Sequence, residues 1–158
     1  MDLGWAKVRG SIDLTERGTS GGVRVTDHKT GRVRAERELV IGGGKVLQPV
    51  LYSLAAEKIL RVNVVEGRLY YCTAAGGYEE RSVVIDEKAR AAAGEFAAIL
   101  TDALKSGFLP AAPDRLGRNQ TECDYCEYRR VCGPYEIRRV SHKPQVRLEA
   151  LKKLREMP

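Results

Sequence analysis

The sequence predicts an α/β fold in which a mixed sheet, built from two hairpins, is flanked by helices. Apolar, β-branched segments occur in two pairs, and a turn rich in glycine separates the members of each pair, which is typical of β-hairpins. A helical pattern follows each pair, and this order favours an α/β layer architecture. The chain has 158 residues, 43% of them hydrophobic, which is enough for one domain with a substantial core.

The first hairpin is predicted over Val8–Leu14 and Val23–Lys29, with its turn centred at Ser20. Residues equidistant from a hairpin turn lie opposite one another and place their side chains on one face. Asp13 and Asp27 are equidistant from Ser20. We therefore expect the two carboxylates to point into a shared space.

The strand period of two places Lys29 on the face of Asp27 and sends the side chain of His28 to the other face. Two carboxylates and an ammonium group on one patch interact strongly, and a divalent metal accounts for such an arrangement. Mg²⁺ or Mn²⁺ would be held by Asp13 and Asp27, with the backbone carbonyl of His28 as a further oxygen ligand. The His28 side chain itself is expected to have a packing or surface role.

A helix is predicted over Lys45–Leu60, beginning near Val46, because Pro49 is tolerated only within the first turn. Its apolar stripe consists of Leu47, Val50, Leu51, Leu54, Ala55 and Ile59. Gln48 and Tyr52 are spaced i and i+4, so they share a face beside that stripe. They are either the polar rim of a core helix or, as their position just after Asp-x-Lys favours, an edge that faces nucleic acid.

The second hairpin is predicted over Arg68–Thr73 and Glu79–Ile85, around Gly76 and Gly77. Cys72 in its first strand is expected to be a buried free thiol. Near the start of the chain, Trp5 is expected to lie in the core or to cover it.

Two further helices are predicted towards the C-terminus. Asp86 is the expected N-cap of an alanine-rich helix over Glu87–Ser106, which Gly107 ends. After a proline-containing loop and a cysteine segment, Gln145–Met157 is predicted to form an amphipathic helix that packs on the domain or on a longer parent protein.

Three of the four cysteines, Cys123, Cys126 and Cys132, lie within ten residues. In a cytosolic protein this spacing indicates metal binding rather than disulfides. Zinc and an iron–sulfur cluster both accept such thiolates. Zinc would require a fourth ligand, for which His142 and Cys72 are the candidates.

The net charge of +6 is unevenly spread. Residues 1–127 hold 18 basic and 18 acidic side chains, whereas residues 128–147 hold six basic residues against Glu136 alone. The basic residues are Arg129, Arg130, Arg138, Arg139, Lys143 and Arg147. This segment is either a solvated basic tail or a patch for a polyanion, with nucleic acid as the leading candidate. No signal peptide and no apolar run of about 20 residues is found, so a cytoplasmic protein without a membrane anchor is expected.

Four motifs occur in a fixed order: Gly-x-Ile-Asp at 10–13, Asp-x-Lys-Thr-Gly at 27–31, Gln-x-x-x-Tyr at 48–52 and Cys-x2-Cys-x5-Cys at 123–132. In this order they resemble the RecB-like branch of the PD-(D/E)XK nucleases. The similarity is closest to the nuclease domains of AddB-type helicase–nuclease subunits and to CRISPR-associated exonucleases. The resemblance implies a restriction-endonuclease-like fold, with a nuclease core at 1–120 and a cysteine-cluster segment with a C-terminal helix at 121–158.

The resemblance also implies the roles of individual residues. Asp13, Asp27, Lys29 and Gln48 would be catalytic, with Lys29 orienting the attacking water or neutralising charge and Gln48 orienting metal ligands or the scissile phosphate. Tyr52 would contact the DNA strand. The basic residues Arg129, Arg130, Arg138, Arg139 and Lys143 are the expected DNA contacts, on single strands or duplex ends.

Two features of the resembling family lie upstream of its Gly-x-Ile-Asp strand. One is a helical segment with an acidic or histidine metal ligand, and the other is the first cysteine of a [4Fe–4S] cluster. Neither is identifiable here, so the chain is expected to be the C-terminal part of a longer protein. A cluster at Cys123, Cys126 and Cys132 would then be incomplete in this chain or replaced by zinc.

Three interpretations follow. The first is a metal-dependent DNA exonuclease domain that works in DNA repair or recombination with a helicase subunit or an N-terminal helicase-like domain. The second is a catalytically weak module of the same fold that binds DNA ends. The third is a structural zinc protein. The intact set of Asp13, Asp27, Lys29 and Gln48 favours the first.

Overall fold

The computed structural model describes every residue except 1–2, 5–6, 8 and 119. The predictions for Trp5, and for Val8 as the start of the first strand, therefore lie outside the described residues. Among the described helices, none is both long and apolar enough to cross a lipid bilayer.

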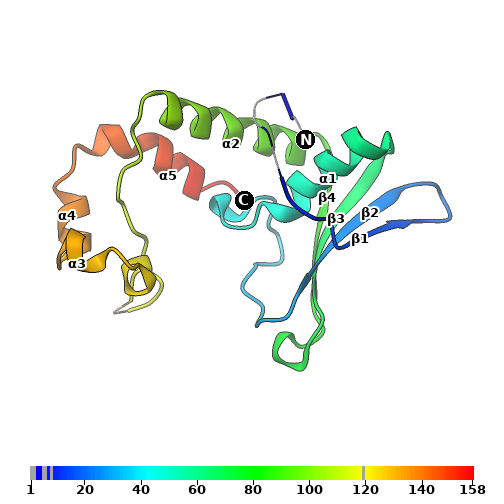
Figure 1. The fold of residues 1–158 in the computed structure, drawn as a ribbon, viewed down its shortest axis with the longest axis horizontal. Helices are drawn as coiled ribbons and strands as arrows, with labels where there is room; N and C mark the ends of the chain where they lie inside the picture. Colours follow the sequence, from blue (N-terminus) through cyan, green and yellow to red (C-terminus); the bar gives the residue numbers. More distant parts are fainter. Residues whose placement is uncertain (1–2, 5–6, 8, 119) are drawn as a thin grey trace.

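A four-stranded mixed sheet forms the centre of the fold, as predicted (Figure 1). Its strands are β1 (Leu14–Arg17), β2 (Val23–Lys29), β3 (Val64–Tyr71) and β4 (Glu80–Val84), and they lie side by side in this order. β1–β2 and β3–β4 are antiparallel hairpins, whereas β2 and β3 run parallel. Two hairpins joined by one parallel pair account for the mixed character of the sheet.

The boundaries of the first hairpin differ from the prediction on one side. β2 has the predicted bounds, but β1 begins at Leu14, where the predicted strand was to end. The register survives this correction, because Leu14 pairs with Thr26 and the ladder is still centred on residue 20. β1 is an exposed edge strand with polar residues, so a search for apolar alternation misses it.

The second hairpin is longer than predicted at its start. β3 begins at Val64 rather than Arg68, because its first residues pair with β2 as well as with β4. It ends at Tyr71, so Cys72 lies just past the strand and is half-buried. A short 3₁₀ turn, η2 (Ala74–Gly76), leads into β4.

The helix α1 (Gln48–Leu60) lies against β2 and β3. It begins two residues after the predicted start, with Pro49 in its first turn. Gly67 of β3 permits this close packing, because a Cβ there would lie 2.2 Å from the carbonyl oxygen of Pro49. Ile59 is 60% exposed, so its assignment to the apolar stripe was wrong.

The helix α2 (Glu87–Lys105) packs against α1, and its alanine-rich face enters the same core. The predicted N-cap is confirmed, since Asp86 Oδ1 accepts a hydrogen bond of 2.9 Å from the backbone N–H of Ala89. The core formed by the sheet and these helices includes Val25, Ile41, Val50, Val64, Leu69 and Phe96.

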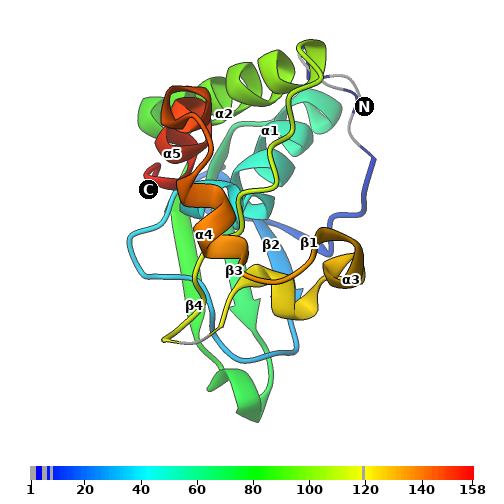
Figure 2. The same ribbon diagram turned by 90° about the vertical axis from the view of Figure 1, so that its left-hand side faces the viewer.

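Past α2 the chain leaves the core and later returns. We define the arm as residues 113–147, which lie between the buried residues Ala112 and Leu148. It contains η3 (Glu122–Tyr125), α3 (Arg129–Cys132) and α4 (Glu136–Ser141), and its end overlaps η4 (Gln145–Leu148). In Figure 1 the arm lies to the left of the sheet, and Figure 2, viewed from that side, shows α3 and α4 in front of it.

The C-terminal residues pack onto the turn that precedes α1. The predicted helix over Gln145–Met157 is divided into η4 and α5 (Glu149–Arg155). Beyond α5, the backbone N–H of Ile41 donates to the Pro158 carbonyl at 2.6 Å, and that of Gly43 donates to the Met157 carbonyl at 2.9 Å. Gly43, in the 3₁₀ turn η1 (Gly42–Gly44), has a φ of 61°, and a Cβ there would lie 2.8 Å from the carbonyl oxygen of Arg155.

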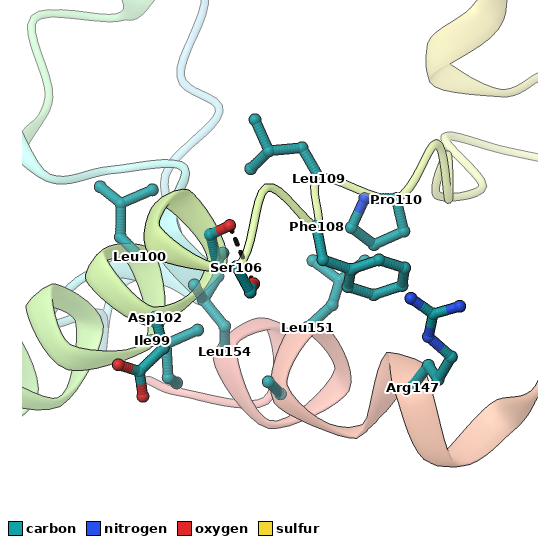
Figure 3. Close-up of a pocket in the computed structure, with 12 residues that line it drawn as sticks. Ile99, Leu100, Asp102, Ser106, Phe108, Leu109, Pro110, Arg147, Leu151 and Leu154 are labelled. Carbon is teal, nitrogen blue, oxygen red and sulfur yellow. Dashed lines mark hydrogen bonds between the residues drawn. The ribbon is translucent and has the colours of Figure 1, made fainter.

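An apolar cavity of about 490 Å³ lies between the C-terminal half of α2, residues 108–110 and α5 (Figure 3). Leu100, Leu151 and Leu154 contribute to its wall. At one end the guanidinium carbon of Arg147 lies 4.3 Å from the centre of the Phe108 ring, a cation–π contact. One of the predicted basic residues is therefore used to join the arm to the core.

Candidate active site

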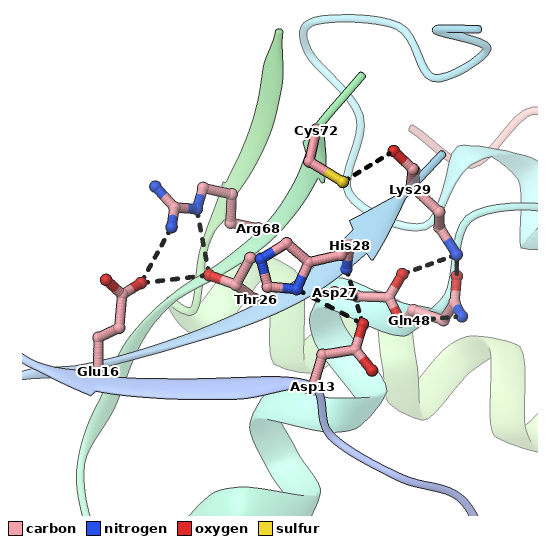
Figure 4. Close-up of polar contacts among 9 residues, drawn as sticks. All are labelled: Asp13, Glu16, Thr26, Asp27, His28, Lys29, Gln48, Arg68 and Cys72. Carbon is pink, nitrogen blue, oxygen red and sulfur yellow. Dashed lines mark hydrogen bonds and ion pairs between the residues drawn. The ribbon is translucent and has the colours of Figure 1, made fainter. Parts of the chain in front are cut away.

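The C-terminal end of β2 and the first residue of α1 bring three polar side chains together (Figure 4). Lys29 Nζ lies 2.7 Å from Asp27 Oδ2 and donates a hydrogen bond of 2.5 Å to Gln48 Oε1. Gln48 Nε2 donates in turn to Asp27 Oδ1 at 3.3 Å. Each of the three side chains thus contacts the other two, in the arrangement that strand alternation predicts for Asp27 and Lys29.

Burial differs within this triad. Asp27 is only 7% exposed, whereas the side chain of Lys29 is 32% exposed and so reaches solvent. The buried Asp27 Oδ2 has no hydrogen-bond partner of good geometry, although the Lys29 ammonium lies within ion-pair distance. A buried carboxylate oxygen with unused lone pairs, close to one ammonium group, is suited to accepting a second cation.

Asp13 lies next to this triad, just before β1, opposite Asp27 in the continued register. Its Oδ2 accepts a hydrogen bond of 2.8 Å from the backbone N–H of His28 and lies 3.7 Å from His28 Nδ1. The His28 ring is on the other face of the sheet, where it meets Tyr70 edge-on with 6.0 Å between ring centres. Asp13 therefore joins the site through the backbone of the residue between Asp27 and Lys29.

The donor set fits a hard divalent cation. In a β-strand the N–H and C=O of one residue face the same neighbour, so the His28 carbonyl faces the same edge as its N–H, towards Asp13. Carboxylate and carbonyl oxygens are the ligands that Mg²⁺ takes, with water and phosphate completing its octahedron. Within the described part of the chain no group of three or more His, Cys, Asp or Glu side chains is arranged to hold a metal. An ion at this site would thus rely on two carboxylates and on oxygens that are not side chains.

Tyr52 lies one turn after Gln48 and is half-buried against the core. Its hydroxyl lies beside Gly10, where a Cβ would meet it at 3.5 Å, an ordinary van der Waals contact. Tyr52 covers the segment that leads to Asp13, and a contact with nucleic acid stays a prediction.

The opposite face of the sheet carries a second polar network, which the sequence did not lead us to expect (Figure 4). The guanidinium of Arg68, whose side chain is 14% exposed, lies 2.9 Å from Glu16 and 3.1 Å from Glu80, and its Nε donates to Thr26 Oγ1 at 3.1 Å. The available signal was an arginine that alternates with the apolar residues of β3. The network binds β1, β2, β3 and β4 together on the face that α1 does not cover.

The predicted cysteine site is not formed by the described residues. Cys123 lies in η3, Cys126 follows it and Cys132 ends α3, and all three are free thiols that are not grouped around a common centre. The Cys-x2-Cys spacing does give a tight turn, with a hydrogen bond of 3.2 Å from the Cys126 N–H to the Cys123 carbonyl. However, Cys132 belongs to a separate short helix, so sequence proximity does not bring the three thiols together.

The two candidates for a fourth ligand are engaged elsewhere. The thiol of Cys72 lies at the end of β3, 3.6 Å from the Lys29 carbonyl. The Nδ1 of His142 lies 2.8 Å from the Arg138 carbonyl within its own helix end. The three cysteines of the arm therefore do not fit a [4Fe–4S] cluster or a closed zinc site as they stand.

The basic segment is only partly directed to solvent. Arg129 pairs with Asp124 and with Glu136, the latter at 3.6 Å. Arg139 donates to the Pro134 carbonyl, and Lys143 donates to the Ala111 carbonyl at 2.5 Å. Arg130 and Arg138 are exposed. Three of the five basic residues predicted to contact DNA thus also hold the arm in shape.

Comparison with known protein families matches residues 2–133 to the PD-(D/E)XK nuclease superfamily. This match covers most of the chain, and the chain belongs to that superfamily. Comparisons with curated proteins and with solved structures gave no match. Membership implies a nucleic-acid substrate and phosphodiester hydrolysis as the possible reaction, and nucleases of this superfamily typically use a divalent metal.

Proposed function

We propose that the chain is the nuclease domain of a DNA exonuclease that depends on Mg²⁺ or Mn²⁺. The observation that carries the proposal is the contact of Asp27, Lys29 and Gln48 at the end of β2, with Asp13 beside them. A buried carboxylate and a lysine that reaches solvent are the groups that a metal-assisted attack on a phosphodiester requires.

Asp13, Asp27 and the carbonyl of His28 would hold the ion. A bound ion of this kind lowers the pKa of a water ligand and balances charge on the phosphate. Lys29 contributes a positive charge beside the ion, where it orients the attacking water or neutralises the charge that develops on the phosphate. Gln48 holds the Lys29 ammonium and the Asp27 carboxylate at once, so it fixes their relative position before substrate arrives.

The order of the motifs supports a place in the RecB-like branch, close to AddB-type subunits and CRISPR-associated exonucleases. In this proposal the domain degrades DNA from ends that a helicase partner opens, during repair or recombination. Residues 1–120 form the nuclease core, and the segment 121–158 contributes DNA contacts through Arg129, Arg130, Arg138, Arg139 and Lys143. Tyr52 contributes a further contact with the DNA strand. The proposed reaction does not involve the three cysteines of the arm.

The test compares the wild-type chain with Asp27→Asn in the degradation of linear DNA with and without Mg²⁺ or Mn²⁺. Glu95→Gln is the matched control, because Glu95 is a carboxylate of α2 whose ion pair among the described residues is with Lys153 near the surface. The wild type and the control should degrade DNA with metal only, and Asp27→Asn should not. Covalently closed circular DNA should resist, because an exonuclease needs an end.

Metal-independent degradation, or full activity of Asp27→Asn, would contradict the proposed site. Binding of DNA ends without any hydrolysis by the wild type would instead support the catalytically weak module. Isothermal titration of Mn²⁺ into the wild type and into Asp27→Asn separates these outcomes, since only an intact metal site gives a difference between the two proteins.

A further inference from the structure

The arm contains a hollow of about 680 Å³ that is separate from the candidate active site. It lies between the segment 115–121, which closes on itself through a bridge between Arg115 and Thr121, and the start of α4. The side chains of four arginines line it: Arg115, Arg118, Arg129 and Arg138. Glu136 is the acidic residue of the lining, so the hollow carries a net positive charge of three.

Most of this charge is not neutralised within the protein. Of the four arginines, Arg129 forms the ion pairs described above, with Asp124 and Glu136. In the described part of the chain Arg115, Arg118 and Arg138 form no ion pair, and all three are exposed. Three unpaired guanidinium groups around one concave surface attract an anion with several charges.

The same part of the arm exposes three tyrosines. Tyr125, Tyr128 and Tyr135 are 76%, 69% and 74% exposed. The chain has seven tyrosines, and the other four lie within residues 52–78. Tyr135 lines the hollow, and Tyr128 is the N-cap of α3, directly before Arg129. These three large aromatic side chains, within residues 125–135, are not explained by packing, because none of them is even half-buried.

We infer that this surface of the arm binds single-stranded DNA, with tyrosines stacking on unpaired bases and the arginines contacting phosphates. Aromatic platforms beside a basic groove are the means by which proteins bind single strands without reading their sequence. A duplex offers phosphates but hides its base faces in the stack, so it would use the arginines alone. The combination therefore favours a single strand over a duplex.

This inference rests on the proposed function for its choice of DNA, and it adds the form of the substrate. Figure 1 shows the arm to one side of the sheet, and Figure 2 shows α3 and α4 in front of the sheet when the molecule is viewed from that side. The arm would hold one strand of a DNA end whose two strands have been separated, and the held strand would lead to the core. Hydrolysis at Asp27 and retention of the strand by the arm are thus two different properties of the chain.

The test measures binding in a metal chelator, where hydrolysis cannot occur. The probe is a fluorescein-labelled oligothymidylate of about 16 nucleotides, the upper end of common single-strand site sizes, and fluorescence anisotropy gives Kd. Tyr125→Ala, Tyr128→Ala and Tyr135→Ala should each weaken binding roughly fivefold or more, as loss of one stacked base predicts. A blunt duplex of the same length should bind more weakly, with a Kd that the three variants do not change.

Tyr78→Ala is the matched control. Tyr78 is also exposed, at 63%, and like Tyr135 it has a positive φ, but it lies at the β3–β4 turn, outside the arm. It should bind the oligothymidylate as the wild type does. Thermal unfolding of every variant checks that the fold is intact. Should Tyr135→Ala lose stability, Tyr135→Phe keeps the ring and should bind normally.

Unchanged binding by all three alanine variants, or equal loss by Tyr78→Ala, would overturn the inference. So would tighter binding of the duplex than of the single strand. These results do not depend on the nuclease reaction, since binding is measured in a metal chelator. Failure of the proposed function would appear as absent hydrolysis with the tyrosine-dependent binding preserved.

Discussion

The candidate active site and the arm both gather charged side chains, but they hold them in different ways. Asp27 is buried in the core, and its lysine partner contacts it from the same strand. In the arm only Thr121 is buried among the described residues, and ion pairs and contacts with carbonyl groups hold the elements together. The comparison teaches that the core can fix a charge in place, whereas the arm offers its charges to solvent and to a partner.

The largest effect is expected from Lys29→Met, which removes the cation of the triad. Turnover on DNA should fall by about a hundredfold to a thousandfold, the cost of losing one group that stabilises transition-state charge. Binding of Mn²⁺ should persist, because the oxygen ligands remain. Single-turnover kinetics and calorimetry measure the two quantities. Loss of metal binding would show that Lys29 mainly maintains the structure of the site. The control is Lys153→Met, at an exposed lysine of α5.

The next largest effect is a loss of stability when the contact between the C-terminal residues and the core is disturbed. Gly43→Ala should destabilise the protein by about 1–3 kcal/mol, because the residue has a positive φ and the new methyl group would meet the Arg155 carbonyl. Gly94→Ala is the control, since nothing lies within 4 Å of a Cβ there and a helix favours alanine. Urea unfolding gives both values. Equal stability of Gly43→Ala and the wild type would mean that the C-terminal contact is loose.

A smaller effect concerns the stability of the fold at low pH. Arg90 donates hydrogen bonds of 2.7 and 2.8 Å to Glu57, and with the N–H of Val64 it holds the pKa of that carboxyl below its ordinary value, against the raising effect of burial. A lowered folded-state pKa stabilises the fold above the unfolded-state pKa of about 4.3, and this stabilisation is lost as pH falls through the folded-state value.

Glu57→Gln should therefore cost about 1 kcal/mol at pH 7, a value reduced by solvent around Arg90. The difference from the wild type should shrink as the pH falls below the unfolded-state pKa and through the lowered folded-state pKa. Urea unfolding over this pH range measures the difference, with Glu95→Gln as the control. A difference that stays constant with pH would show that the ion pair does not contribute.

The smallest effect is a difference between two arginines of the arm in their contribution to the salt dependence of DNA binding. Arg138→Gln should lower the slope of log K against log salt for DNA binding by about 0.7–0.9, as loss of one phosphate contact predicts. Arg139→Gln should lower it less, because the guanidinium of Arg139 is already bound to the Pro134 carbonyl. Anisotropy titrations at several salt concentrations decide between them. Identical slopes for both variants and the wild type would make the basic segment a solvated tail.

The sequence predicted the central part of the fold because its signals are local. Turn glycines and β-branched runs located both hairpins, Asp86 and Gly107 bounded α2, and equal distance from Ser20 gave the β1–β2 register, in which Leu14 pairs with Thr26. The shared face of Asp27 and Lys29 follows from strand alternation alone. Gln48 joined them only because α1 crosses the sheet at Gly67, a contact between segments that no local pattern contains.

The arm could not be predicted in the same way. Its elements have four to six residues, too few for a period to show, and their positions depend on ion pairs between side chains. The cysteine spacing suggested a metal centre, but a spacing does not fix where Cys132 points once it belongs to a separate helix. The sequence gives the number of basic residues in the segment but not their contacts. Arg129, Arg139 and Lys143 bind to groups of the arm and its base.

The arm is attached to the core at both of its ends. Ala112 and Leu148 are buried, Lys45 and Arg155 pair with Asp114 and Glu122 at its base, and α5 closes the path through the contacts of Pro158 with Ile41. The arm is therefore an insertion between two anchored helices, and the entropy of closing such a loop changes slowly with its length. A short flexible linker in its place should therefore leave the fold of α2 and α5 intact, so the length and surface of the arm can change without a change in the core.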